Sequence, residues 1–343
     1  MKSIKQLIKK ILLVDEGPKP LIFREQLKPI NSYDKGGFKY CEFGNLNPDK
    51  TFYIIKRSSH AGIFSYVSFV LNHLVISKEN NFIPIVDMEN YVNPYNEIES
   101  IENTFNSWQY YFKQVSNYDL NEVYKSKNDF HHKMSYRIHL DKNFENFKNK
   151  EISIKDKYKV FLDNFMNDNN LYNKKILGIH FRGTSYKTSR GHILPATENQ
   201  IQKYIDEILR KESHDKIFLC TEETRYLNFL KRKYPNQLLY LNTYRSNKND
   251  AFLKYERKNH RYLLGDEAIK DTLILSKCSS LLFVRSNIIN AANYFSEKEQ
   301  TMYEVFNGFN SRNQFIARWL WYIKKNLPKR FYGLNDELII SKN

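Results

Sequence analysis

The fold is decided by the stretch Lys175-Ile-Leu-Gly-Ile-His-Phe-Arg182-Gly-Thr-Ser-Tyr186. An apolar run ends abruptly at His180 and Arg182, as a buried strand does when it delivers polar side chains to the carboxyl edge of a parallel sheet. Ligands of open α/β sheets bind at that edge. An arginine placed there can hold a phosphate through two parallel hydrogen bonds. We therefore expect Arg182 to bind a phosphate group.

Strands and helices alternate through the rest of the second half of the chain. Apolar runs of strand length lie at 216–220, 237–242 and 280–284, and helical patterns lie at 197–209, after 221, at 266–277 and at 287–295. This alternation predicts right-handed βαβ units and a parallel sheet, hence an α/β protein. Residues 51–88 show the same strand–loop–helix–strand outline. Residues 89–150 give no assignable topology.

The aromatic cluster at 103–112 has two interpretations. Tyrosine and tryptophan side chains among residues 105–118 could stack on the rings of a bound ligand, or they could form part of the core. We favour the core, because aromatic side chains bury a large apolar area.

The composition favours a folded protein with anionic partners. The chain has 343 residues, 41% of them hydrophobic, and a formal net charge of +16. Such a charge attracts nucleic acid, anionic lipid or phosphorylated substrates, although a solvated lysine-rich surface explains it equally well. The three cysteines are far apart and lack CxxC spacing, so we expect reduced thiols, no metal site and a cytoplasmic location.

The first 14 residues form a basic amphipathic pattern. Their apolar side chains recur at helical spacing between lysines, and no small-residue cleavage site follows them. Such a helix lies on an anionic membrane surface or docks on the protein itself. Since no apolar run reaches the roughly 20 residues of a transmembrane helix, any membrane association is expected to be peripheral, on the inner membrane.

Polar side chains follow three of the predicted strands. The first strand ends in His180 and Arg182, the second is followed by Thr221 and Glu222, and the last is followed by Arg285, Ser286 and Asn287. Because the carboxyl ends of parallel strands share one edge of the sheet, these three loops converge on one cleft. The sequence therefore predicts a nucleotide or phosphate site there.

These segments resemble a known family. His180-Phe-Arg182-Gly-Thr-Ser185 resembles the HxRR(T/G)D motif of the α1,6-fucosyltransferase and NodZ-like group and of the wider fucosyltransferase superfamily. Residues 219–223 resemble the second motif of that group, and 273–287 resemble the third. The loop His60-Ala-Gly62 resembles its glycine-containing first loop. The resemblance spans roughly residues 51–300, although only the short motifs are specific.

The resemblance implies a GT-B fold, in which two Rossmann-like domains with parallel sheets face each other across a cleft. The expected domains are 1–165 on the acceptor side, 166–310 for the nucleotide-sugar, and 311–343 as a helix that packs back on the body. It also implies an inverting transfer of fucose from GDP-fucose without a metal or other cofactor. Arg182 would stabilise the departing GDP. The implied donor-binding residues are His180, Arg182, Thr184, Thr221, Glu222, Ser286, Asn287, His60 and Gly62.

The motif departs from the family pattern at three positions. Gly183 replaces its second arginine, Ser185 replaces its aspartate, and Arg190 stands where an acidic residue would align. The base that takes the acceptor proton is then His192 or Asp87, since both are suited to proton transfer. A GDP-linked deoxysugar related to fucose, or a GDP-linked heptose, could bind to the same donor-binding residues.

The predicted activity is therefore GDP-sugar-dependent glycosyl transfer in the building of a bacterial surface polysaccharide. The acceptor would be a glycan or a lipid-linked saccharide. The alternative is a basic nucleic-acid-binding protein without catalysis, but the sequence has no RNP, helix-turn-helix or zinc-finger pattern. A different phosphotransfer enzyme is disfavoured, because neither GxxxxGK[ST] nor GxGxxG occurs.

Overall fold

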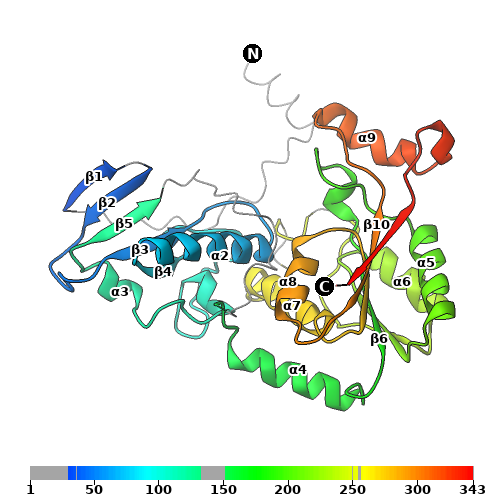
Figure 1. Cartoon of the computed structure of the whole chain (residues 1–343), viewed down its shortest axis with the longest axis horizontal. Helices are drawn as coiled ribbons and strands as arrows, with labels where there is room; N and C mark the ends of the chain where they lie inside the picture. The colour runs from blue at the N-terminus through cyan, green and yellow to red at the C-terminus, as the bar shows by residue number, and fades with distance from the viewer. Residues whose placement is uncertain (1–29, 36, 133–150, 249, 254–255, 343) are drawn as a thin grey trace.

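The computed structural model describes residues 30–35, 37–132, 151–248, 250–253 and 256–342. The chain forms two sheets with helices around them (Figure 1). The amphipathic segment 1–14 lies outside the described residues. Within the described part of the chain, no helix combines the length and the apolar character that a membrane crossing requires.

The first sheet is mixed, with the strand order β1-β2-β5-β3-β4. Its strands are β1 (Asn31–Lys35), β2 (Phe38–Glu42), β3 (Phe52–Lys56), β4 (Ile83–Asp87) and β5 (Asp129–His132). Only β3 pairs in parallel, with β4 and with β5, whereas β2 pairs antiparallel with β1 and with β5. The predicted parallel arrangement is present in β4, β3 and β5, and the antiparallel strands β2 and β1 extend it. β1 and β2 form a tight hairpin, and at its turn Gly37 adopts a φ of 98°, a value that favours glycine.

The second sheet has the order β11-β10-β9-β6-β7-β8. Its strands are β6 (Ile176–His180), β7 (Lys216–Cys220), β8 (Leu238–Leu239), β9 (Ser280–Phe283), β10 (Thr301–Phe306) and β11 (Glu337–Lys342). All neighbours are parallel except β11, which adds antiparallel to β10. Of the strand predicted at 237–242, only the two residues of β8 are in strand conformation. The tail 311–343 contains β11 in addition to the predicted helix.

Helices cover both sheets. They are α2 (Ile63–Glu79), α3 (Leu120–Val123), α4 (Asp156–Asp168), α5 (Glu198–Lys211), α6 (Thr224–Lys233), α7 (His260–Leu275), α8 (Asn287–Phe295) and α9 (Gln314–Lys324), with short 3₁₀ turns η1 (Ser107–Tyr110), η3 (Thr184–Lys187) and η4 (Lys329–Phe331). A capping box opens α5: the side chain of Thr197 accepts from the backbone N–H of Gln200, whose side chain accepts from the backbone N–H of Thr197.

One hydrophobic cluster joins the two halves. It contains side chains of α2, α7 and α8 together with the aromatic cluster around η1. Trp108, Tyr110, Tyr111 and Phe112 are fully buried, which confirms their interpretation as core residues. The hydroxyl of Tyr111 donates to the backbone oxygen of Tyr262 on α7 (3.0 Å), so this cluster ties the first half to the second.

Candidate functional site

A cleft of about 660 Å³ opens between the two halves of the chain. The first half contributes the loop and helix start around His60 and Gly62, and also Tyr95. The second half contributes the carboxyl edge of its sheet. The predicted site residues that line this cleft are His60, Gly62, His180, Arg182, Thr184, His192, Thr221, Glu222 and Asn287.

Arg182 follows β6 and extends along the cleft wall. Its guanidinium carbon lies 4.3 Å from the centre of the Tyr186 ring, and its Nε lies 3.8 Å from Oε1 of Glu222. Among the described residues, this buried Nε has no hydrogen-bond partner. The guanidinium is thus oriented by an aromatic face and one carboxylate, while its hydrogen-bonding capacity remains available for a phosphate.

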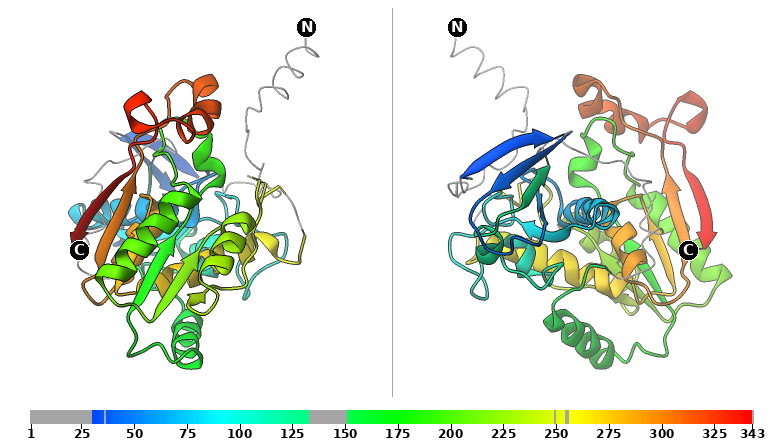
Figure 2. Two further views of the ribbon diagram at one scale, coloured as in Figure 1. Left: turned by 90° about the vertical axis from the view of Figure 1, so that its right-hand side faces the viewer. Right: turned by 60° about the vertical axis from the view of Figure 1, so that its left-hand side comes forward.

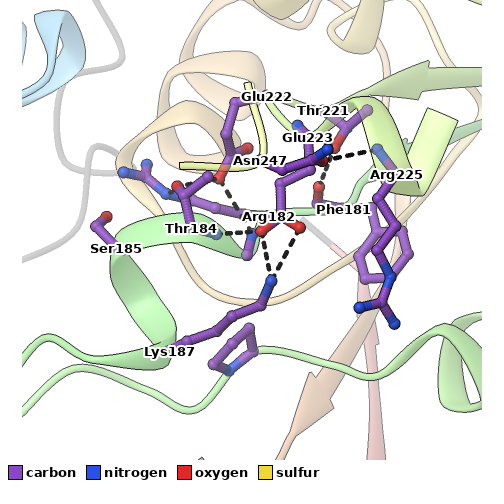
Figure 3. A network of polar contacts seen from close by, with 12 residues as sticks. Phe181, Arg182, Thr184, Ser185, Lys187, Thr221, Glu222, Glu223, Arg225 and Asn247 are labelled. Carbon is purple, nitrogen blue, oxygen red and sulfur yellow. Dashed lines mark hydrogen bonds and ion pairs between the residues drawn. The ribbon is translucent and has the colours of Figure 1, made fainter. Parts of the chain in front are cut away.

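Two adjacent glutamates after β7 hold the loop that carries Arg182 (Figure 3). Oε1 of Glu222 accepts from the backbone N–H of Gly183 (3.1 Å) and from the hydroxyl of Thr184 (2.9 Å). Glu223 accepts from the backbone N–H of Thr184 and pairs with Lys187 at 2.6 and 2.9 Å. Burial raises the pKa of Glu223, and Lys187 opposes that shift. Thr184 therefore serves mainly to anchor the loop to Glu222 and Glu223.

The departure at Gly183 has a structural reason. A Cβ atom there would clash with the Glu223 carboxylate and would lie 2.7 Å from Cε2 of Tyr226. The Tyr226 ring is itself stacked on Phe181, with ring centres 3.6 Å apart. Close packing leaves no space for an arginine at position 183.

His180 is a neutral, buried link between β6 and the start of α8. Its Nδ1 lies 3.1 Å from Oγ of Ser286, and that hydroxyl caps α8 by accepting from the backbone N–H of Ile289. Burial, followed by the nearby charge of Arg182, lowers the pKa of His180 to about 3. Thr221 similarly uses its hydroxyl within the protein, donating to the backbone oxygen of Phe181 at 2.6 Å. His180, Thr221 and Ser286 thus fix the strand ends around the cleft.

The start of α8 adds a second element suited to anions. Asn287 and Ile288 line the cleft at the first turn of this nine-residue helix. Backbone N–H groups at a helix start lack partners within the helix and carry partial positive charge, so they favour a phosphate. Arg182 and α8 therefore contribute positive potential to the same cleft.

The two candidates for the base occupy different environments. His192 lines the cleft, with its ring centre 5.0 Å from that of Tyr186, and keeps solvent contact. The protein atoms around it, followed by the charge of Arg182, lower its pKa. Asp87 does not line the cleft. Its oxygens accept from Tyr124 (2.6 Å) and from the side chain and backbone of Asn90 (3.0 and 2.9 Å), so the structure does not bring it to the other predicted residues.

Asp271 on α7 lines the cleft and was missed by the sequence analysis. It is buried, and within the part of the chain that the structure describes its Oδ1 has no hydrogen-bond partner. Burial raises its pKa to about 7, while nearby Arg245 and a hydrogen bond with Cys220 oppose the shift. The sequence offered no clear signal for it, because Asp271 stands between the polar residues Lys270 and Thr272 in a helical pattern.

Among the residues that the structure describes, no three His, Cys, Asp or Glu side chains gather in a group able to hold a metal ion. Cys41, Cys220 and Cys278 are all buried free thiols.

Comparison with known proteins supports the fold. No protein-family model and no curated protein matches the chain. Among solved structures, NodZ α-1,6-fucosyltransferase soaked with GDP-fucose is 11% identical with a TM-score of 0.53, over 86% of this chain and 100% of that chain. The Se-Met fucosyltransferase NodZ from Bradyrhizobium has the same identity and TM-score, over 86% and 99%. NodZ co-crystallised with GDP is 11% identical with a TM-score of 0.51, over 75% and 95%. The chain therefore has the GT-B fold of these fucosyltransferase structures, as its resemblance to that group predicted.

Proposed function

We propose that the chain is an inverting, metal-independent glycosyltransferase. It transfers fucose, or a related deoxysugar or heptose, from a GDP-sugar to a hydroxyl of a bacterial surface glycan or lipid-linked saccharide. The observation that carries this proposal is the guanidinium of Arg182, oriented toward the inter-domain cleft beside the first turn of α8. The neighbours of the same fold include NodZ structures with GDP and GDP-fucose.

The donor diphosphate is assigned to Arg182 and the start of α8. When the bond between the sugar and the β-phosphate breaks, negative charge grows on the departing GDP. A fixed arginine and a helix start stabilise that charge without reorganisation. Two groups of this kind supply what a metal ion supplies in other transferases.

The guanine base is assigned to the pocket around Asp271. A carboxylate presents two acceptor oxygens, which match the N1–H and 2-amino donors of guanine. Binding would give the Oδ1 atom of Asp271 a hydrogen-bond partner, which none of the described residues provides. Neither adenine nor uracil offers that pair of donors, so this residue would select GDP.

His192 is assigned the acceptor proton. The acceptor oxygen forms its bond to the anomeric carbon from the face opposite to GDP, its proton passes to His192, and GDP leaves with the bonding electrons. A histidine with a lowered pKa is unprotonated at neutral pH and is therefore ready to accept that proton. Asp87, whose oxygens are occupied by internal partners, is the weaker of the two candidates.

Nucleotide binding tests the proposal directly. In calorimetry without divalent metal, GDP should bind while UDP and ADP bind at least tenfold more weakly, and Asp271→Asn should remove this preference. Arg190→Ala is the matched control for Arg182→Ala, because Arg190 is an exposed arginine in the same loop that does not line the cleft. Equal affinity for all three nucleotides would refute the donor assignment, as would tighter binding of single-stranded DNA than of GDP.

A further inference from the structure

The outward face of α9 exposes a continuous apolar stripe. Its members are Phe315, Ile316, Trp319, Tyr322 and Ile323, each between 40% and 66% exposed. At 100° per residue they fall within one side of the helix. Leu327, Phe331 and Tyr332 extend this exposed surface beyond the helix end. Large apolar patches of this kind on soluble domains mark interaction surfaces.

The stripe does not hold α9 on the protein, because the opposite face does. Ala317 and Trp321 are buried, and Trp321 packs with Leu194 and Leu334. The indole N–H of Trp321 donates to the backbone oxygen of Pro195 at 2.8 Å. The helix is therefore anchored by one side and presents the other as a fixed surface at the periphery of the molecule (Figure 2).

The charge around the stripe has a single sign. Residues 311–335 contain no Asp or Glu, and their basic residues are Arg312, Arg318, Lys324, Lys325, Lys329 and Arg330. Among the described residues, Lys329 alone of these forms an ion pair, with Glu337. A second copy of this face, or the lysine-rich segment 1–14, would bring like charges together. The occupant that the charge favours is anionic.

We propose that α9, together with residues 325–332, docks on the surface of a bilayer containing anionic phospholipid. Apolar side chains of an amphipathic helix enter the headgroup region while basic residues pair with lipid phosphates. Trp and Tyr are the residues that favour this interface. The stripe carries Trp319 and Tyr322 at its centre, with Tyr332 beyond it.

Docking would place the cleft loop close to the lipid. The ring of Trp321 lies 5.3 Å from Nζ of Lys187 in η3, and Nδ2 of Asn310 donates to the backbone oxygen of Ala317 on α9. The loop carrying Arg182 and the membrane helix are thus in direct contact. A membrane-embedded acceptor would reach the cleft by a short path.

The tryptophans provide a direct test. Of the three in the chain, Trp108 and Trp321 are buried and Trp319 is 66% exposed. Titration of the full chain with phosphatidylglycerol–phosphatidylcholine vesicles should shift the emission to shorter wavelength and reduce acrylamide quenching. Pure phosphatidylcholine vesicles should give neither change. Trp319→Phe should remove the spectral response while vesicle co-sedimentation persists.

A matched pair of charge variants locates the surface. Arg318→Glu with Lys325→Glu should weaken co-sedimentation roughly tenfold or more, since each basic residue near an anionic surface contributes to attraction. Arg232→Glu with Lys233→Glu makes the same charge change on α6 and should leave vesicle binding unchanged. Circular dichroism melting and GDP binding confirm that each variant is folded.

Three results of the vesicle experiments would overturn the proposal. The first is that the α9 and α6 charge variants weaken vesicle binding equally. The second is that the α9 charge variant binds vesicles as tightly as the wild type. The third is that the wild type binds vesicles without a change in the emission of Trp319. The second and third would assign any membrane contact to another segment. Concentration-dependent dimerisation through α9, lost in Trp319→Ser, would identify a second copy as the occupant instead.

Discussion

The two sheets both place polar side chains at the carboxyl ends of parallel strands. In the first sheet these are Lys56, Asp87 and His132, at the ends of β3, β4 and β5. Nζ of Lys56 lies 3.1 Å from Nδ1 of His131, and Asp87 is bonded to Tyr124. In the second sheet, Arg182 follows the end of β6 and faces the cleft with unused hydrogen-bonding capacity.

The difference lies in how the hydrogen bonds are used. At the carboxyl edge of the first sheet, the polar groups are buried and bonded within the protein, and burial lowers the pKa of Lys56 to about 8. At the second edge, the internal bonds are made by glutamates, a threonine and a serine, and they orient the arginine. A polar residue at a strand end is thus a candidate for binding only if its neighbours satisfy the loop without it.

The largest effect should come from Arg182→Ala. Removing the guanidinium leaves the developing charge on GDP without its main partner, so kcat should fall by about 10²–10³. GDP affinity should fall as well. Arg190→Ala, in the same loop, should keep kcat within about twofold. If Arg182→Ala kept full activity, the carboxyl edge of the second sheet would have no functional role that distinguishes it from that of the first.

His192→Ala should lower kcat by about 10² while GDP affinity is retained, because only the proton transfer is lost. The lowered pKa of His192 means that it protonates below its ordinary pH, so the wild-type rate should fall only as pH drops below about 6.5. Added imidazole should partly restore the variant. Loss of GDP affinity in His192→Ala would instead indicate a donor-binding residue.

Asp87→Asn should affect folding rather than binding. The carboxylate accepts several hydrogen bonds, one from the buried Tyr124, and hydrogen bonds to charged groups contribute about 1.5–3 kcal/mol each. Urea denaturation should show a loss of that order, with GDP affinity unchanged. Asp163→Asn is the control, since its tyrosine contact with Tyr172 is exposed and its change should stay within about 0.5 kcal/mol. A kcat loss without destabilisation would return Asp87 to the list of candidate bases.

GDP affinity should rise as pH increases from 6 to 8. The raised pKa of Asp271, about 7, means that the carboxylate form becomes dominant across this range. The rise should be several-fold and absent in Asp271→Asn, as measured by calorimetry at each pH. A pH-independent affinity would show that guanine does not contact this side chain.

The smallest effect is expected at Asp129→Asn in the first sheet. Asp129 is buried, its carboxyl oxygens have no hydrogen-bond partner among the described residues, and burial raises its pKa to about 8. Between pH 4 and 8 the unfolded chain holds this proton less tightly, so folding stability falls as pH rises. The neutral variant should therefore melt a few degrees higher at pH 8 and equally at pH 4. If the difference in melting temperature between the variant and the wild type were the same at pH 4 and at pH 8, the burial argument would be contradicted.

Four strands of the second sheet, β6 to β9, could be predicted from the sequence because apolar runs there alternate with helical patterns. In the first sheet β3 and β4 could be predicted in the same way. β1, β2 and β5 could not, since they pair through contacts between distant segments that local periodicity does not encode. β10 and β11 were missed for the same reason, because their pairing with neighbouring strands decides their structure. Among the candidate site residues, those that follow a strand and line the cleft could be named from the sequence. Asp271 could not, because only the folded packing of α7 shows that it faces the cleft.

The packing around Gly183 also constrains how this protein can change by substitution. An arginine at this position, as in the resembling motif, requires both the Glu223 carboxylate and the Tyr226 ring to move. If Glu223 is removed first, the ammonium group of Lys187 loses the carboxylate to which it is bonded. Positions 183, 187, 223 and 226 are therefore coupled through direct contacts. A change at one of them is expected to destabilise the loop unless a neighbouring position changes with it.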